Sequence, residues 1–127
     1  MNDERGTMNP KPPQALRERT TKYALRVIRL YASLPKTTES QVIGKQLLRS
    51  GTSVGAHYRE ANRAKSTADF ISKMEGGIQE LDETAYWIEL LVEGSFLPAG
   101  RVAELQKETD ELLAIFVASV KTAKKRK

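Results

Sequence analysis

The chain has 127 residues, 39% of them hydrophobic and 29% charged, with a net charge of +5, and its length suits one domain that buries its own core. It contains no cysteine, which excludes a disulfide framework, a thiolate metal site and a cysteine nucleophile. No apolar run reaches the roughly 20 residues that cross a bilayer, and the first residues lack the apolar centre of an export signal, so we expect a cytoplasmic protein without a membrane partner.

The chain begins with a polar, proline-containing stretch, residues 1–13, which we expect to be a disordered arm. The spacing then predicts a helix over 14–34 that ends before Pro35, because a residue that precedes proline disfavours helical backbone angles. The apolar face of this helix comprises Leu16, Thr20, Tyr23, Val27, Leu30, Tyr31 and Leu34.

A second helix is predicted over 39–63, with Thr38 as its cap and Gln41 three residues further on. The side chains at its centre are unusually small. Two glycines there, Gly51 and Gly55, each lower the stability of the helix by about 0.5–1 kcal/mol relative to alanine. We interpret them as sites where a neighbouring helix comes close, against the alternative of a weak helix. The apolar face comprises Ile43, Leu47, Gly51, Val54, Tyr58 and Ala61.

A third helix is predicted over 67–93, capped by Ser66 with Asp69 in a capping-box pattern. Gly76 and Gly77 lie inside it and indicate a bend or a close contact. The predicted buried face comprises Phe70, Met74, Gly77, Ile78, Leu81, Ala85, Ile88 and Val92.

The end of this third helix is apolar on nearly every side, and Tyr86, Trp87 and Leu90 point away from the predicted face. One small bundle covers only one side of a helix, so these residues, with Glu83, predict an interface with a second copy. The alternative is that the N-terminal arm or a loop covers this patch.

Gly94 is expected to end the third helix by taking a left-handed backbone conformation. A fourth helix should follow it and carry Pro98 in its first turn. We expect 121–127 to form a basic tail whose last four residues fray. The prediction is thus an all-α protein, an antiparallel up-down-up-down four-helix bundle over 14–120. The buried face of the fourth helix comprises Val102, Leu105, Thr109, Leu112, Phe116 and Val120.

Charge is unevenly distributed, since residues 67–93 hold seven acidic and one basic side chain while the other segments are basic. A row of basic residues on the outer side of the second helix could follow a phosphate backbone, without reading bases. The alternatives are a solvated face and a basic face that meets the acidic third helix of the next subunit. The nucleic-acid candidates are Lys45, Arg49, Arg59 and Arg63, with Lys22, Arg26, Arg29, Lys121, Lys124 and Lys125.

The central stretch resembles a known family. The residues that carry the resemblance are Gln46–Ser50, Ser53–Ala56, Arg59–Ala61, Ser66, Asp69–Phe70, Gly76, Glu80–Leu81 and Tyr86–Leu91, with Leu34–Pro35 before them. Together they resemble the four-helix-bundle proteins encoded in intervening sequences of bacterial 23S ribosomal RNA genes. The resemblance covers roughly 16–120, and His57 stands where the family usually has asparagine.

This resemblance implies an antiparallel four-helix bundle that forms a ring-shaped homopentamer and has no defining catalytic activity. A related branch comprises accessory proteins of diversity-generating retroelements, which are basic pentamers that associate with nucleic acid and a reverse transcriptase. We therefore expect a non-enzymatic oligomer that binds RNA or DNA. The alternative is a purely structural or protein-interaction oligomer.

An enzymatic site is not indicated by the sequence. His57 is the only histidine, and its place beside the buried face predicts a structural role. The acidic residues of the third helix scatter around it, and no glycine loop for phosphate is present. We expect no cofactor and no metal.

Overall fold

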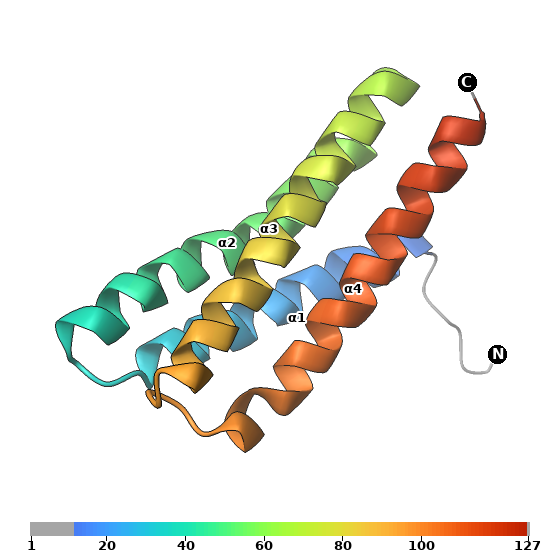
Figure 1. The fold of residues 1–127 in the computed structure, drawn as a ribbon. Coiled ribbons are helices and arrows are strands. Elements are labelled where there is room, and N and C mark those ends of the chain that lie inside the picture. The colour runs from blue at the N-terminus through green and yellow to red at the C-terminus, as the bar shows by residue number, and fades with distance from the viewer. Residues whose placement is uncertain (1–11, 127) are drawn as a thin grey trace, which may run out of the picture.

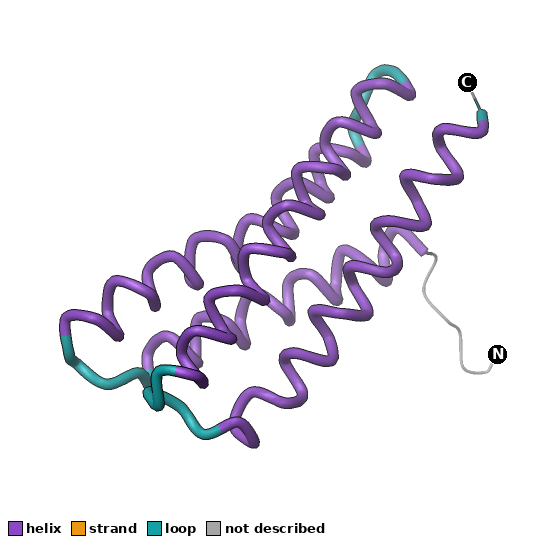
Figure 2. Tube along the Cα trace, in the orientation of Figure 1, coloured by secondary structure: helices purple, strands orange, loops and turns teal. Residues whose placement is uncertain are grey.

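Four α-helices fold back on one another, each antiparallel to the one before it (Figure 1). The computed structural model describes residues 12–126, with side chains from residue 15 onwards. The connections lie at the two ends of the bundle (Figure 2), and no strand occurs among the described residues. The helices are α1 (Pro12–Ala32), α2 (Thr38–Asn62), α3 (Thr67–Glu93) and α4 (Ala99–Lys125). The predicted all-α antiparallel bundle is confirmed, whereas the prediction for residues 1–11 lies outside the described residues.

Side-chain caps fix where α2 and α3 begin. The Ser66 hydroxyl accepts a hydrogen bond from the Asp69 backbone N–H at 3.0 Å, which confirms the predicted cap of α3. The cap of α2 is Thr37, whose hydroxyl accepts from the Ser40 N–H at 3.3 Å. The prediction of Thr38 was wrong by one residue, because Thr37 is the threonine that keeps an extended backbone, with φ −79° and ψ 157°.

Four further helix ends differ from the predictions. Helix α1 starts at Pro12, inside the predicted arm, because a proline in the first turn has no N–H to leave unpaired. Gly94 has φ −80° and is not left-handed; Ser95 takes the positive angle instead, with φ 65°. Helix α4 begins after Pro98, which is its cap, and continues to Lys125 through part of the predicted tail.

Glycines on α2 allow α1 to pack directly on its backbone. A methyl group on Gly51 would lie 2.7 Å from Val27 Cγ2, and one on Gly55 would lie 3.1 Å from Thr20 Oγ1. Both distances are shorter than ordinary contacts, so a side chain at Gly51 needs a shift of Val27, and one at Gly55 needs Thr20 to move by a few tenths of an ångström. This close approach confirms the interpretation of the small residues in the centre of α2.

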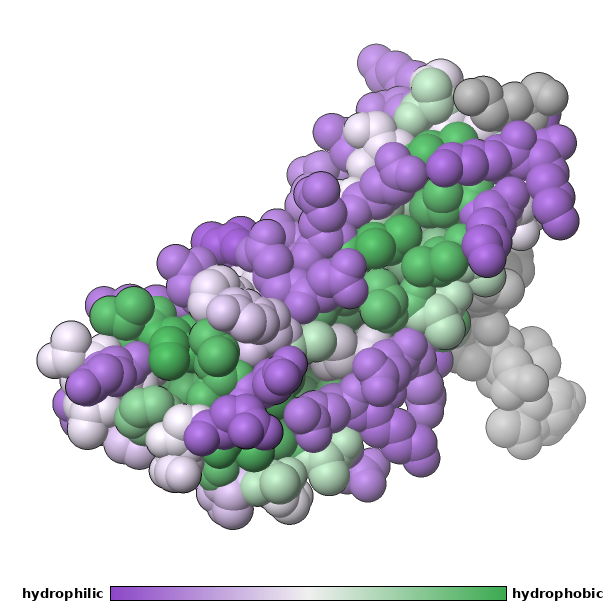
Figure 3. Space-filling view, viewed as in Figure 1, coloured by the Kyte–Doolittle hydropathy of each residue, from purple (hydrophilic) through white to green (hydrophobic). Residues whose placement is uncertain are grey.

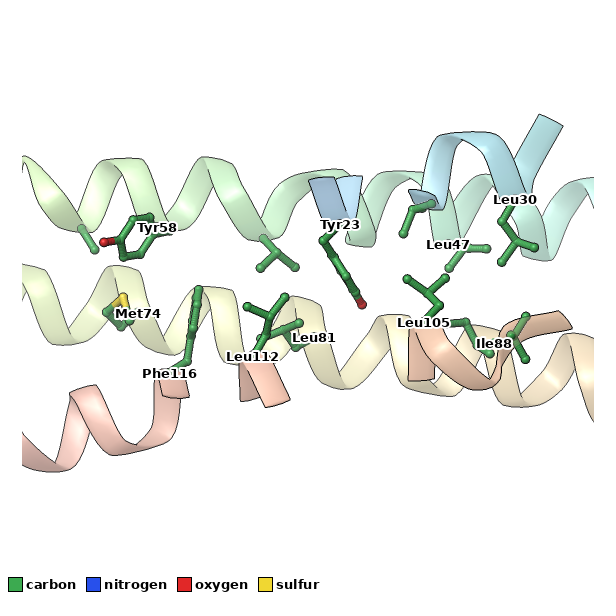
Figure 4. Close-up of a cluster of buried hydrophobic side chains, with 14 of the residues drawn as sticks. Tyr23, Leu30, Leu47, Tyr58, Met74, Leu81, Ile88, Leu105, Leu112 and Phe116 are labelled. Carbon is green, nitrogen blue, oxygen red and sulfur yellow. The ribbon is translucent and has the colours of Figure 1, made fainter. Parts of the chain in front are cut away.

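Helix α4 inserts the aromatic ring of Phe116 into the core, at a place where a glycine of α3 leaves room for it. Phe116 is fully buried, and its ring centroid lies 6.0 Å from that of Tyr58 on α2. Figure 4 shows this ring among the buried side chains, with Met74 of α3 close by. A methyl group on Gly77 would lie 2.6 Å from Phe116 Cε2, so the glycine makes space for the ring. The predicted close contact at Gly77 is therefore confirmed.

The buried face of α3 is rotated relative to the prediction. Its buried residues are Ile71, Met74, Gly77, Leu81, Thr84, Ile88 and Leu91, whereas Phe70, Ile78, Ala85 and Val92 are only partly buried. Both α2 and α4 pack on α3, so the buried arc is centred between two neighbours. Trp87 packs against this core, which corrects the prediction that it points away from the bundle. Its indole Nε1 is buried and has no hydrogen-bond partner among the described residues.

Polar side chains join α1 to α4, the neighbouring pair of helices with the least backbone contact. Arg19 donates to both carboxylate oxygens of Glu108, at 3.0 and 2.6 Å. Deeper in the bundle, the Tyr23 hydroxyl lies 2.7 Å from Thr109 Oγ1. Thr109 donates its own proton to the Leu105 carbonyl at 2.8 Å, so Tyr23 is the donor in this pair.

Tyr23 makes the stability of the bundle sensitive to alkaline pH. Burial raises the pKa of its hydroxyl to about 12, from about 10 in an unfolded chain. The unfolded state therefore loses this proton first, so the stabilisation is complete below pH 10 and declines as the pH rises through about 12. We expect Tyr23→Phe to remove about 2 kcal/mol of this alkaline loss between pH 8 and pH 11.5. Urea unfolding at pH 8 and at pH 11.5 measures it, and equal losses in both proteins would contradict the prediction.

Candidate nucleic-acid interface

The predicted basic row on α2 is not a uniform free surface. Arg49 donates to Glu83 at 2.6 Å and to Glu80 at 3.3 Å, both on α3. Arg59 donates to the Thr21 hydroxyl of α1 at 3.1 Å. Only Lys45 and Arg63 of this row are exposed and lack an ion pair among the described residues. The structure therefore ties the middle of the row to neighbouring helices of the same chain.

The other predicted basic residues separate into two groups. Lys22, Arg26 and Arg29 lie on α1 and form no ion pair within residues 12–126. Lys121, Lys124 and Lys125 lie on the last turns of α4, where Lys124 Nζ is 3.5 Å from Glu75 Oε2. The three lysines of α4 thus lie together near the end of that helix, whereas the three basic residues of α1 lie elsewhere along the bundle.

One end of the bundle gathers positive charge from segments far apart in the sequence. The antiparallel arrangement places the α2–α3 connection beside the end of α4 (Figure 1). The exposed basic residues there, which we call the basic end, are Arg63, Lys65, Lys121, Lys125 and Arg126, and none has an acidic partner within 4 Å among the described residues. Arg126 belongs to the predicted basic tail, whereas Lys65 was not predicted, although it lies in a basic run that flanks a predicted helix end.

A groove of about 700 Å³ opens at the basic end between α4 and the start of α3. Phe70, Ile115 and Ala118 contribute apolar surface to it, and Lys65 and Arg126 contribute positive charge. Figure 3 shows apolar surface in the furrow between α3 and α4, with hydrophilic side chains on both sides. The end therefore combines cations with a partly open apolar surface.

His57 belongs to the packing between α2 and α3. Its Nε2 lies 3.6 Å from Glu80 Oε2, and a methyl group on Gly76 would lie 2.7 Å from its ring. The ring thus lies against the backbone of α3. Among residues 12–126, no group of three or more histidine, aspartate or glutamate side chains could hold a metal ion. In the same range, no helix is both long and apolar enough to cross a membrane.

The residues predicted for an oligomer interface differ in exposure. Tyr86 is 52% exposed, whereas Trp87 and Leu90 are partly buried. Tyr86 and Trp87 touch through their rings, with centroids 5.0 Å apart. Glu83 is exposed but is paired with Arg49 of its own chain. Of the four, Tyr86 alone offers a large exposed apolar side chain.

Comparison with known proteins gives one family. The sequence matches the 23S rRNA-intervening sequence protein family over residues 15–118. A crystal structure from Bacteroides thetaiotaomicron, described as a protein with unknown function from the S23 ribosomal protein family, is 33% identical with a TM-score of 0.80. The match covers 86% of this chain and 97% of that one. A comparison with curated proteins found no match. The chain therefore belongs to the family of 23S rRNA-intervening sequence proteins.

Proposed function

We propose that this protein is a non-enzymatic, cytoplasmic homo-oligomer that binds nucleic acid through the basic end of its bundle. The observation that carries the proposal is the cluster formed by Arg63, Lys65, Lys121, Lys125 and Arg126, which are exposed and lack acidic partners among the described residues. Folding brings these charges together from two regions separated by more than fifty positions. Such a cluster attracts a phosphate backbone more strongly than the same charges dispersed.

The contacts at the basic end should be to phosphates, because the sequence contains no base-reading motif and lysine and arginine form charge-assisted hydrogen bonds with phosphate oxygens. Several copies in one assembly would present several basic ends to the same strand. Linked sites of this kind raise the overall affinity without new contacts. The family resemblance suggests five copies in a ring, and a reverse transcriptase as a protein partner, as narrower forms of the proposal.

Reversing three charges at the basic end tests the proposal. In the variant Arg63→Glu, Lys121→Glu and Lys125→Glu we expect the affinity for RNA or DNA to fall about tenfold or more. The slope of log K against log salt should also decrease by about 2–3, because each lost phosphate contact removes about 0.7–0.9. Fluorescence anisotropy with labelled single-stranded and duplex oligonucleotides, across a salt series, measures both quantities.

The matched control is Lys36→Glu, Arg101→Glu and Lys107→Glu, three exposed residues toward the opposite end of the bundle. Both triple variants change the net charge by six, from +5 to −1, so only the position of the charges differs. The control should keep most of the affinity. Equal losses in the two variants, or a wild-type protein that binds neither nucleic acid, would refute the proposal. A basic-end variant that loses its assembly instead would identify this surface as a protein interface.

A further inference from the structure

Helix α1 carries apolar side chains on its outer side as well as in the core. Leu25 is 43% exposed and Ile28 is 42% exposed. At about 100° per residue, both lie on the side of α1 opposite the buried Tyr23 and Val27. A row of positive charge runs beside them, formed by Lys22, Arg26 and Arg29, with spacings of four and three residues. We call these five residues the α1 face.

Helix α3 carries the opposite combination on its outer side. Asp82, Tyr86, Glu89 and Glu93 follow one another at spacings of four, three and four residues, so they form one row along the helix. Tyr86 is 52% exposed in the centre of the row. The three carboxylates are exposed and form no ion pair within residues 12–126, unlike Glu80 and Glu83, which bind Arg49. We call these four residues the α3 face.

The two faces cannot meet within one chain. Helices α1 and α3 occupy opposite corners of the bundle, and their backbones do not come close to each other among the described residues. Their outer sides therefore point away from each other. Each chain presents a basic apolar row on one side and an acidic apolar row on the other. Two different patches on opposite sides are what a head-to-tail assembly requires.

We propose that the α1 face of one copy docks on the α3 face of the next copy. Lys22 and Arg26 are four residues apart, about 6 Å along a helix, and Glu89 and Glu93 have the same separation. Leu25 and Ile28 supply aliphatic contacts beside the ring of Tyr86, so apolar burial accompanies the charge pairing. The inference rests on the proposed assembly and specifies which surfaces form it.

This docking assigns a different partner to some of the predicted residues. The row on α1, considered from sequence as a nucleic-acid contact, would lie between subunits. The idea that basic α2 meets the acidic α3 of the next subunit loses support, because Arg49 already pairs with Glu80 and Glu83 of its own chain. The basic end lies outside both faces and stays accessible in the assembly. Assembly and nucleic-acid binding therefore depend on separate residues.

Charge reversal on each face tests the docking. One variant carries Lys22→Glu, Arg26→Glu and Arg29→Glu, and another carries Asp82→Lys, Glu89→Lys and Glu93→Lys. Each alone should reduce the mass measured by light scattering from a multiple of the chain mass to 14.2 kDa. A chain with all six changes should assemble again, because both faces are reversed together. An equimolar mixture of the two triple variants should also associate, as alternating complexes with an even number of chains, because each contact then pairs an acidic face with a basic one.

Far-ultraviolet circular dichroism and thermal unfolding of each variant check that the bundle still folds, and the restored six-fold variant provides the same check in the assembled state. If the wild type assembles but either triple variant keeps the full mass, the docking is wrong while the proposed assembly stands. The same holds if the six-fold variant stays a single chain. A wild type that is itself a single chain at micromolar concentration refutes the proposed assembly and this docking with it.

Discussion

Replacing Phe116 with alanine is expected to lower the free energy of unfolding by about 3–5 kcal/mol, which is a large part of the stability of a domain of this size. The ring is fully buried, packs against Tyr58 and lies directly over the backbone at Gly77. Alanine would leave a cavity between α2, α3 and α4 that the helices can close only in part. Chemical denaturation followed by circular dichroism measures the change.

Ile115→Ala is the matched control, because Ile115 precedes Phe116 on α4 but lies at the open groove. It should lower the free energy of unfolding clearly less than Phe116→Ala does. A second check is the coupling with Gly77, since Gly77→Ala should destabilise the wild type by overpacking but should be tolerated in the Phe116→Ala protein. A loss below about 1.5 kcal/mol for Phe116→Ala would show that this ring does not hold α4 in place.

Valine at Gly51 is expected to destabilise the protein by about 1–3 kcal/mol, although valine favours a helix more than glycine does. The side chain would overlap the methyl groups of Val27, which lie 2.7 and 2.8 Å from the position of a new Cβ. Helix α1 would have to move away from α2. Combining Gly51→Val with Val27→Ala should recover much of the loss, because the two changes act on one contact.

Gly100→Val serves as the matched control. Apart from its sequence neighbours and the backbone of its own helix, nothing lies within 4 Å of a Cβ built on Gly100, so the substitution meets open space in the first turn of α4. It should change the free energy of unfolding by about 0.5 kcal/mol or less, because only the helix preference differs. Equal effects at Gly51 and Gly100 would mean that the close approach of α1 and α2 does not limit side-chain size.

The four helices and part of their packing could be predicted because their signals are local. A repeat of three and four residues fixes each helix, and the Ser66 cap needs only its own neighbours. The side of α3 that is buried depends on two neighbouring helices, so a single periodic face placed Trp87 outside when it packs against the core. Thr37 and Thr38 are the same residue type, and only the backbone angles decide which one caps α2.

The candidate site was predicted less completely, because a charge pair depends on residues distant in sequence. A helical wheel places Arg49 on the outer side of α2, but it does not show that Glu80 and Glu83 reach it from α3. The same limit applies to the basic end, where Arg63 and Lys125 come together only through the antiparallel fold. Leu25 and Ile28 were missed, although two apolar residues three positions apart on an outer face were a visible signal.

The even number of antiparallel helices has a practical consequence for handling the protein. Helix α1 starts and α4 stops at the same end of the bundle, which is also the end where the unpaired cations gather (Figure 1). A purification tag or fluorescent fusion joined directly to the start of α1 or to the end of α4 would therefore crowd the surface whose binding is to be measured. The connection between α3 and α4, at the far end, is the better place to insert a label.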